Sequence, residues 1–123
     1  MQKRILIIDD DTDLLDLLVL LLSDYGYLDQ TNNTGVNFFD QIEEFKPGII
    51  LLDINLSGLN GRDILKAIKS TKNTFGIPVI MISADESLYN TIGPFGANDV
   101  VRKPFDFDHL TKRIERQISQ LRG

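Results

Sequence analysis

The sequence has no cysteine and a single histidine among its 123 residues. Without cysteine the chain can form neither a disulfide framework nor a thiol nucleophile. That composition fits a reducing compartment, so we expect a cytoplasmic protein. The one histidine, His109, falls inside a predicted helix just after its N-terminal cap at Asp106. We expect it to be a surface residue without a catalytic role.

Long apolar runs and an excess of positive charge are also missing. The first apolar run, residues 5–8, is too short for a signal peptide or a membrane span. The net charge of −5 argues against direct contact of this domain with nucleic acid or with an anionic membrane. The remaining composition, 42% hydrophobic and 25% charged, is typical of a globular domain. With no repeat or linker visible, we predict one domain over residues 1–123.

Five short apolar segments alternate with segments of helical periodicity. Residues 49–52 form an unbroken run of isoleucine and leucine that ends at Asp53, which is typical of a strand buried on both faces of a parallel sheet. The alternation predicts a flavodoxin-like, doubly wound α/β fold, with five parallel strands in the order 2-1-3-4-5 and five helices in two layers. The predicted strands are residues 5–8, 27–31, 49–53, 77–83 and 99–102, and the predicted helices are about 13–25, 36–45, 64–70, 86–95 and 107–121.

Three segments within this pattern are unusual. The first helix is apolar nearly all round from Leu17 onward. We expect neighbouring helices to bury it, and the alternative is an exposed apolar surface. Gly93-Pro94 interrupts the fourth helix, which we expect to be short, bent or mobile. Residues 55–61 are rich in turn formers and are predicted to be a loop.

Polar residues recur where the predicted strands end. In the order 2-1-3-4-5 the first and third strands are neighbours at the topological switch point, so Asp10 and Asp53 would meet in one crevice. Carboxylates held close together repel one another, and a divalent cation such as Mg²⁺ relieves that repulsion while accepting phosphate oxygens. The polar residues at the strand ends are Asp9, Asp10 and Asp11 after the first strand, Asp53 at the third, Ser83 at the fourth and Lys103 after the fifth.

This set of residues suits a planar phosphoryl group, with Lys103 as a point charge and Ser83 as a hydrogen-bond donor. The nucleophile has to be a carboxylate, because the chain has no cysteine and Ser83 has no evident base. Attack of Asp53 on phosphorus would give an acyl phosphate. Each residue alone has a simpler explanation as a helix cap, a turn former or a solvated lysine. Helix caps and turn formers alone do not readily explain four such groups at the same end of four strands.

Two other classes of protein share parts of this pattern. A haloacid-dehalogenase-type phosphatase carries an Asp-x-Asp motif followed by Thr or Val, whereas here Asp9 and Asp11 are followed by Asp13, and the chain is short for that family. Turnover of a small phosphomonoester would support that class. The same spacing suggests an EF-hand calcium loop, but Leu14 stands where that loop requires glycine and Leu20 where it requires glutamate.

Over essentially its whole length the sequence resembles the receiver domain of two-component response regulators, the family that includes single-domain chemotaxis regulators. The resemblance rests on five motifs at the strand ends and in the loops that follow them. These are Ile7-Ile8-Asp9-Asp10-Asp11, Leu51-Leu52-Asp53 with Gly61 eight residues later, Ile82-Ser83-Ala84, Gly96-Ala97 and Lys103-Pro104-Phe105.

The resemblance implies a phosphoacceptor and a metal site. Asp53 would accept a phosphoryl group from the phosphohistidine of a histidine kinase or of a phosphotransfer protein. The reaction would depend on Mg²⁺, for which Mn²⁺ could substitute. Asp10 and Asp53 would bind the metal directly, Asp9 would bind it chiefly through water, and the backbone carbonyl of Asn55 would be a further ligand.

The resemblance also assigns roles around the phosphoryl group. Ser83 would bond a phosphoryl oxygen and move toward it on activation, and Lys103 would pair with the phosphoryl group, or with Asp53 before phosphorylation. A cis peptide bond is implied between Lys103 and Pro104. We also predict that Asn55 and Asp85, polar residues two positions beyond Asp53 and Ser83, influence the attacking water and so tune dephosphorylation. The domain would then be a signalling protein that assists its own phosphorylation and dephosphorylation, not an enzyme acting on other molecules.

The sequence departs from the family pattern at three places. Leu56-Ser57 stands where the family usually has Met-Pro, which we interpret as a loop adjustment. Val100 occupies the position of the family's switch aromatic, so we expect no aromatic-coupled switching. Pro94 falls within the fourth helix, and we expect it to alter the face that the family commonly uses for output.

The partners implied are a histidine kinase or phosphotransfer protein and a downstream protein or output domain. A homodimer is a further possibility, since the leucine-rich first helix and the fourth helix are both candidate interfaces. The alternative function is a pseudo-receiver that binds proteins without being phosphorylated. The presence of Asp10, Asp53, Ser83 and Lys103 favours the phosphorylated class.

Overall fold

The structure is a computed structural model that describes residues 3–93 and 95–122. Its main sheet has five parallel strands in the order β2-β1-β3-β6-β7. Counting only these five, the order is 2-1-3-4-5, so the predicted fold is confirmed. The strands are β1 (Lys3–Ile8), β2 (Tyr27–Asn32), β3 (Ile49–Asp53), β6 (Val79–Ser83) and β7 (Asp99–Arg102).

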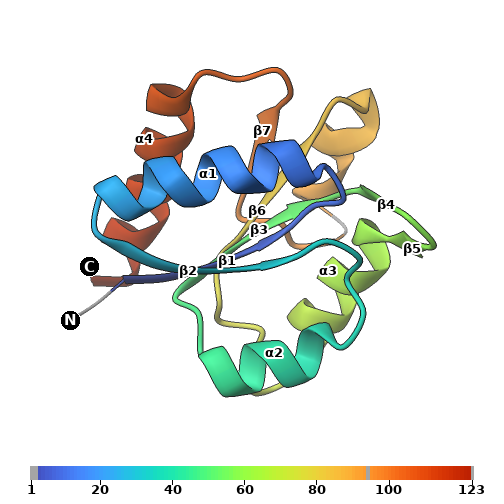
Figure 1. Ribbon diagram of the computed structural model, residues 1–123. Coiled ribbons are helices and arrows are strands. Elements are labelled where there is room, and N and C mark those ends of the chain that lie inside the picture. Colours follow the sequence, from blue (N-terminus) through green and yellow to red (C-terminus); the bar gives the residue numbers. More distant parts are fainter. Residues whose placement is uncertain (1–2, 94, 123) are drawn as a thin grey trace.

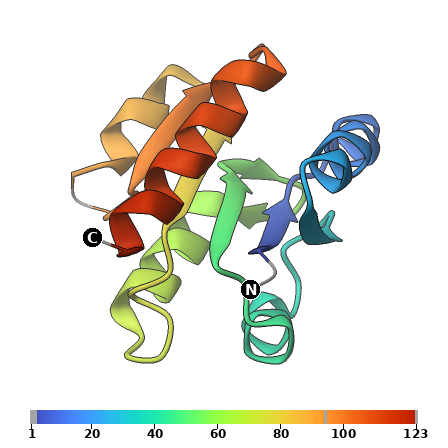
Figure 2. The same cartoon turned by 90° about the vertical axis from the view of Figure 1, so that its left-hand side faces the viewer.

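Helices cover both faces of the sheet (Figures 1 and 2). Helices α1 (Thr12–Asp24) and α4 (Phe107–Arg122) pack on one face. Helices α2 (Phe38–Phe45) and α3 (Gly61–Ser70) pack on the other face, together with the short 3-10 helix η1 (Glu86–Thr91). Short connections and right-handed crossovers give this arrangement when parallel strands alternate with helices.

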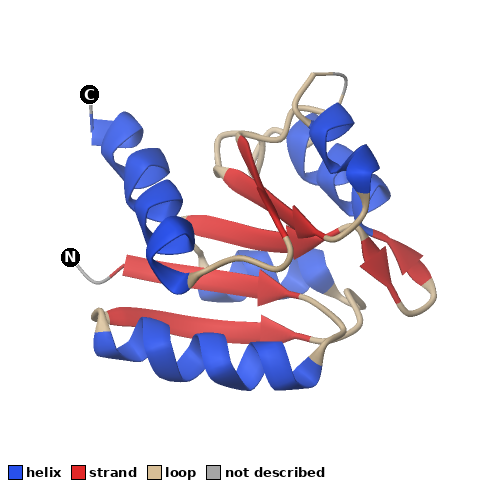
Figure 3. Ribbon diagram, turned by 90° about the horizontal axis from the view of Figure 1, so that it is seen from above, coloured by secondary structure: helices blue, strands red, loops and turns tan. Residues whose placement is uncertain are grey.

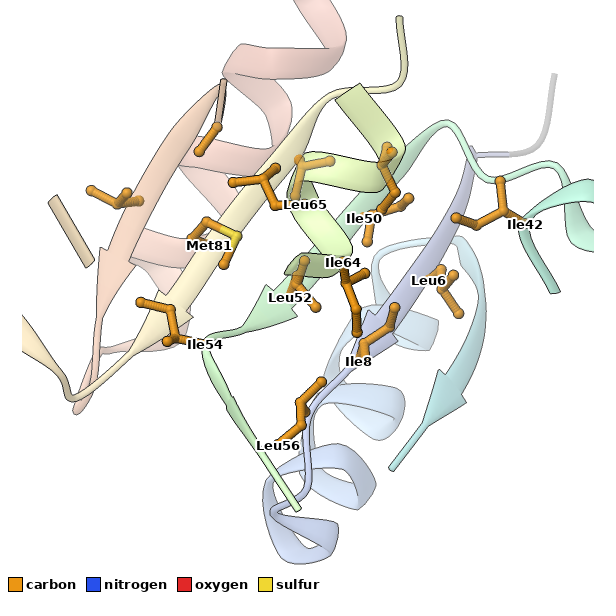
Figure 4. Close-up of a cluster of buried hydrophobic side chains, with 14 of the residues drawn as sticks. Leu6, Ile8, Ile42, Ile50, Leu52, Ile54, Leu56, Ile64, Leu65 and Met81 are labelled. Atoms are coloured by element: carbon orange, nitrogen blue, oxygen red, sulfur yellow. The ribbon is translucent and has the colours of Figure 1, made fainter. Parts of the chain in front are cut away.

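Side-chain alternation along the central strand divides the core into two clusters. Ile50 and Leu52 of β3 point toward α2 and α3, where they meet Ile64 and Leu65 (Figure 4). Ile49 and Leu51 point toward α1 and α4. Every residue of β3 is buried, as expected for a parallel strand covered on both faces.

Helix boundaries follow capping signals in the sequence. The carboxylate of Asp11 accepts a hydrogen bond from the backbone N–H of Leu14, and that of Asp106 accepts one from His109. Side-chain oxygens at these positions pair with N–H groups that the first helical turn leaves unpaired. The predicted cap at Asp106 is therefore confirmed, and His109 is exposed.

The prediction of a short fourth helix was confirmed, and the prediction of a loop at residues 55–61 was wrong. The fourth helix, η1, is a six-residue 3-10 helix that ends at Thr91, before the end expected near residue 95. This agrees with the expectation of a short element, while Pro94 itself lies outside the described residues. The predicted loop at residues 55–61 contains a small antiparallel hairpin of β4 (Asn55–Leu56) and β5 (Leu59–Asn60). Gly58 makes its tight turn possible with a φ of +83°.

The burial expected for the first helix was also wrong. Leu15, Leu18 and Leu22 are buried, but Leu17 and Leu20 are 51% and 63% exposed. One face of a helix suffices to cover this part of the sheet, so the additional leucines remain at the surface. The alternative interpretation, an exposed apolar surface on α1, is the correct one.

Candidate functional site

The predicted acidic residues meet at the carboxyl end of the sheet. Strands β1 and β3 are adjacent, with Ile8 opposite Leu52, so the residues that follow them lie side by side. Asp9 and Asp53 are buried and Asp10 is exposed. One carboxylate oxygen from each of the three lies within 4.8 Å of the others. The crevice at the switch point therefore contains the carboxylate cluster predicted from the sequence.

Lys103 lies between two of these carboxylates. Its Nζ is 2.7 Å from Oδ2 of Asp9 and 3.0 Å from Oδ2 of Asp53. The lysine follows β7, and the backbone N–H of Lys103 donates to the carbonyl of Ser83, which fixes the direction of the loop. The peptide bond between Lys103 and Pro104 is cis, as predicted.

Burial and pairing act against each other in this cluster. Burial raises the pKa of Asp9 above its ordinary value, although the hydrogen bond from Lys103 lowers it in part. Burial alone would lower the pKa of Lys103, but its hydrogen bonds to Asp9 and Asp53 outweigh that effect, so the pKa of Lys103 is raised. The ammonium group therefore stays charged between the two buried carboxylates.

Ser83 ends β6 beside the phosphoacceptor candidate. Asp53 is opposite Ile82 in the ladder, which places Ser83 one position farther along the neighbouring strand. Its side chain is buried, and its hydroxyl oxygen accepts a hydrogen bond from the backbone N–H of Asp85. A hydroxyl group at this place can still donate its proton to an oxygen held at Asp53.

The loops around Asp53 are held by glycine and by backbone hydrogen bonds. The N–H of Asn55 donates to Oδ1 of Asp53 over 3.2 Å. Gly61 approaches the backbone so closely that a Cβ atom there would lie 1.9 Å from the carbonyl oxygen of Asp53. Only glycine allows the β4–β5 hairpin to return to the end of β3 in this way.

The hairpin supplies a contact that the sequence did not predict. The hydroxyl of Ser57 donates to Oδ2 of Asp10 over 3.4 Å. Ser57 is one of the departures from the family pattern, and we interpreted it as a loop adjustment. The sequence analysis predicted a loop here, whereas Ser57 lies at the tip of the β4–β5 hairpin.

The residues predicted to tune dephosphorylation lie beside each other at the mouth of the site. Asp85 caps η1, where its carboxylate accepts from the backbone N–H of Ser87 over 2.9 Å. The pKa of Asp85 is lowered by that hydrogen bond first, and also by Arg62 and by a hydrogen bond from Asn55. Arg62, at the start of α3, also donates to the hydroxyl of Ser87. The effect of Asn55 and Asp85 on hydrolysis remains a prediction.

Val100 is buried in the core cluster beneath η1, opposite Met81 in the ladder. Beside it is a hollow of about 420 Å³ whose lining includes Tyr89, Phe105 and His109. The position of the family's switch aromatic is thus occupied by a small valine that borders this hollow. The expectation that aromatic-coupled switching is lost remains a prediction.

An apolar groove adjoins the acidic cluster. It has a volume of about 390 Å³, and leucines of α1 line one side of it. Lys103, Pro104 and Phe105 line the other side, so the groove and the acidic cluster share the side chain of Lys103. Figure 3 shows how the strand ends and their loops gather at one end of the sheet. None of the described helices is both long and apolar enough to cross a membrane.

The donor atoms fit a hard divalent cation. Three carboxylates at the ends of two adjacent strands offer oxygen ligands within reach of one another, and Asp10 is exposed to the solvent from which an ion would enter. Mg²⁺ binds one or two carboxylates and keeps water ligands, which suits a site open on one side.

Comparison with known proteins identifies the family. The sequence model described as "Response regulator receiver domain" matches residues 5–115. The chain is 34% identical over 126 residues to the nitrogen assimilation regulatory protein NtrX of Azorhizobium caulinodans, covering 99% of this chain and 27% of that protein. It is 28% identical over 120 residues to the DNA-binding response regulator MtrA of Mycobacterium tuberculosis, covering 96% of this chain and 51% of that protein. The chain thus spans about half the length, or less, of these curated relatives.

Solved structures agree with this result. A response regulator receiver domain protein (CheY-like) from Methanospirillum hungatei superposes with a TM-score of 0.89 at 30% identity, covering 98% of this chain and 96% of that one. A response regulator described as putative, from Chloroflexus aurantiacus, gives a TM-score of 0.88 at 27% identity, covering 97% of this chain and 99% of that one. The chain therefore belongs to the response regulator receiver domain family, whose members act in two-component signal transduction.

Proposed function

We propose that Asp53 accepts a phosphoryl group from a phosphohistidine, in a reaction that requires Mg²⁺ or Mn²⁺. The observation that carries this proposal is the position of the Asp53 carboxylate, which contacts the Lys103 ammonium group and has carboxylate oxygens of Asp9 and Asp10 within 4.8 Å. A nucleophile, a cation site and a fixed positive charge within a few ångströms are the parts that phosphoryl transfer needs.

The chemical step exchanges one bond to phosphorus for another. An oxygen of Asp53 forms the new P–O bond as the P–N bond to the donor imidazole breaks, and the imidazole leaves with the electron pair of that bond. Lys103 pairs with the transferred phosphoryl group, and the hydroxyl of Ser83 donates to one of its oxygens. Asp9, Asp10, Asp53 and the backbone carbonyl of Asn55 would hold the divalent ion, which supplies charge neutralisation at the phosphoryl oxygens.

The resulting acyl phosphate would be hydrolysed at this same site. Asn55 and Asp85 lie at the mouth of the site, where their side chains can orient or exclude the attacking water. We therefore propose a signalling domain that assists its own phosphorylation and dephosphorylation rather than an enzyme with a separate substrate. We propose the cytoplasm as the place of this reaction, because a chain without cysteine suits a reducing compartment.

The phosphodonor would dock in the apolar groove between α1 and the loop after β7. The exposed Leu17 lines this groove, and so does Lys103, which contacts Asp53, so a partner helix held there would have its histidine near the phosphoacceptor. Exposed apolar surface next to a reactive group is typical of a protein-binding site. A downstream protein or output domain would read the phosphorylated state.

Intact mass measurement tests this proposal. The protein is incubated with acetyl phosphate and Mg²⁺ beside Asp53→Asn, and beside Asp63→Asn as a control at an exposed acid of α3. The wild type and Asp63→Asn should gain one phosphoryl group, while Asp53→Asn or omission of the metal should abolish the gain. If neither acetyl phosphate nor a phosphorylated kinase modifies the wild type, the domain is a pseudo-receiver and the proposal is wrong.

A further inference from the structure

The charges of the chain are distributed unevenly. Residues 5–45 contain ten of the 18 acidic residues and none of the 13 basic ones. These residues form most of β1 and all of α1, β2 and α2, which lie together at one edge of the sheet (Figure 1). That edge is therefore strongly negative, well beyond what the net charge of −5 suggests.

Two adjoining hollows run along this edge. The first, of about 720 Å³, lies between α1 and α2 and is lined by Asp16, Asp40 and Glu44 among others. The second, of about 640 Å³, shares Gln30 and Glu44 with the first. We name the two together the β2-edge groove. Strand β2 has six residues and is about 20 Å long, which is the length of a helix of about 13 residues.

Apolar side chains are exposed along the same groove. Val36 lines the first hollow and is 57% exposed, and Leu28 lines the second and is 40% exposed. Leu20 on α1 is 63% exposed; it lines neither hollow but lies one helical turn beyond Asp16, which lines the first. Exposed apolar groups among acidic ones match a partner that is both apolar and cationic.

The groove suits a helix better than an added strand. The side chain of Gln41 donates to the backbone carbonyl of Thr31 and to the side chain of Gln30. The carbonyl of the next residue, Asn32, accepts a hydrogen bond from the N–H of Asp9 on the β1 side of β2. Successive carbonyls of a strand point to opposite sides, so the carbonyl of Thr31 faces the open edge of the sheet. An added strand would need this carbonyl, which α2 already occupies.

We infer that the β2-edge groove docks a lysine- or arginine-rich amphipathic helix of a partner protein. A second copy of this chain fits less well, because its eleven basic residues beyond residue 45 are interspersed with eight acidic ones. Arg4 and Lys46 close the far end of the second hollow, which limits the acidic stretch and would orient the helix. The inference does not depend on phosphoryl transfer at Asp53.

Fluorescence anisotropy with a defined peptide tests this inference. The probe is a fluorescein-labelled amphipathic helix of about 18 residues made of lysine, leucine and alanine, and the control peptide has glutamate in place of lysine. The test variant is Asp40→Asn/Glu44→Gln. The matched control is Asp108→Asn/Glu115→Gln, which also removes one first-turn acid and one exposed glutamate, but from α4.

The lysine peptide should bind the wild type at low salt, and high salt should weaken that binding. The α2 variant should bind about tenfold more weakly, and the α4 variant within about twofold of the wild type. Equal losses in both variants would mean that only net charge matters and would overturn the inference. So would binding of the glutamate peptide, no binding of either peptide, or a salt-sensitive dimer that excludes the peptide.

Discussion

Replacement of Lys103 with methionine should lower the free energy of unfolding by about 3 kcal/mol. The lysine side chain is 19% exposed, and it contacts the side chains of Asp9 and Asp53, which are 0% and 7% exposed. Removing one member of a buried ion pair costs about 3–5 kcal/mol, because the remaining charge loses both its partner and its water. We expect the lower end of this range, since Asp9 can take up a proton.

The assay is urea unfolding followed by circular dichroism in the presence of EDTA. With a urea dependence of about 1.5 kcal/mol per molar, the midpoint should fall by roughly 2 M. A domain stable by about 5–15 kcal/mol survives this loss and remains measurable. Lys112→Met, at an exposed lysine of α4, is the control and should change the midpoint little.

The loss of stability should also depend on pH. The folded-state pKa of Asp9 is raised above its ordinary value of 3.8, so ionised Asp9 lowers stability at neutral pH. That cost disappears as the pH falls through the raised pKa. Without the hydrogen bond from Lys103 the pKa of Asp9 should rise further, so the deficit of Lys103→Met should narrow as the solution is acidified below neutral pH. A deficit below about 1 kcal/mol, or one independent of pH, would refute the reasoning.

Three further predictions concern the same end of the sheet. Mg²⁺ at a hundred times its Kd should stabilise the protein by about 2.7 kcal/mol in thermal melts, and Asp10→Asn should remove most of that gain. Gly61→Ala should destabilise by about 3 kcal/mol in urea, because its Cβ would collide with the carbonyl of Asp53; Gly58→Ala, with open space around it, should cost only about 1 kcal/mol. Asn55→Lys and Asp85→Ala should change the half-life of the acyl phosphate in a mass-spectrometric decay assay, and unchanged half-lives in both would contradict their assigned role.

The sheet and the acidic cluster were predictable because each rests on a strong local signal. The run at residues 49–53 is apolar at every position before its acid, and such a segment is stable only when both of its faces are covered. Once the strand order is known, the carboxyl ends of the strands are expected at one edge of the sheet. Asp9, Asp53, Ser83 and Lys103 then lie together at that edge. The carboxylate cluster therefore follows from topology and needs no detail of side-chain packing.

The errors concern segments where the signal is weak or the decisive contacts are distant. The β4–β5 hairpin has only two residues in each strand, so no periodicity marks it, and Gly61 is what returns its end to β3. The exposure of Leu17 and Leu20 depends on which helices lie beside α1, which the sequence of α1 alone does not contain. Local patterns predict the secondary structure that a segment can form, while the elements packed against it determine how much of its surface is buried.

The contact between Lys103 and Asp9 joins residues that are far apart along the chain. During synthesis, Asp9, Asp53 and Ser83 all emerge before the strand that carries Lys103 to the sheet. A ribosome-bound chain that ends before Lys103 would lack the charge that offsets the buried acids. By our proposed mechanism, such a nascent chain could not yet be phosphorylated. The domain would accept a phosphoryl group only after β7 and Lys103 have been translated. Incomplete chains would therefore consume no phosphorylated donor.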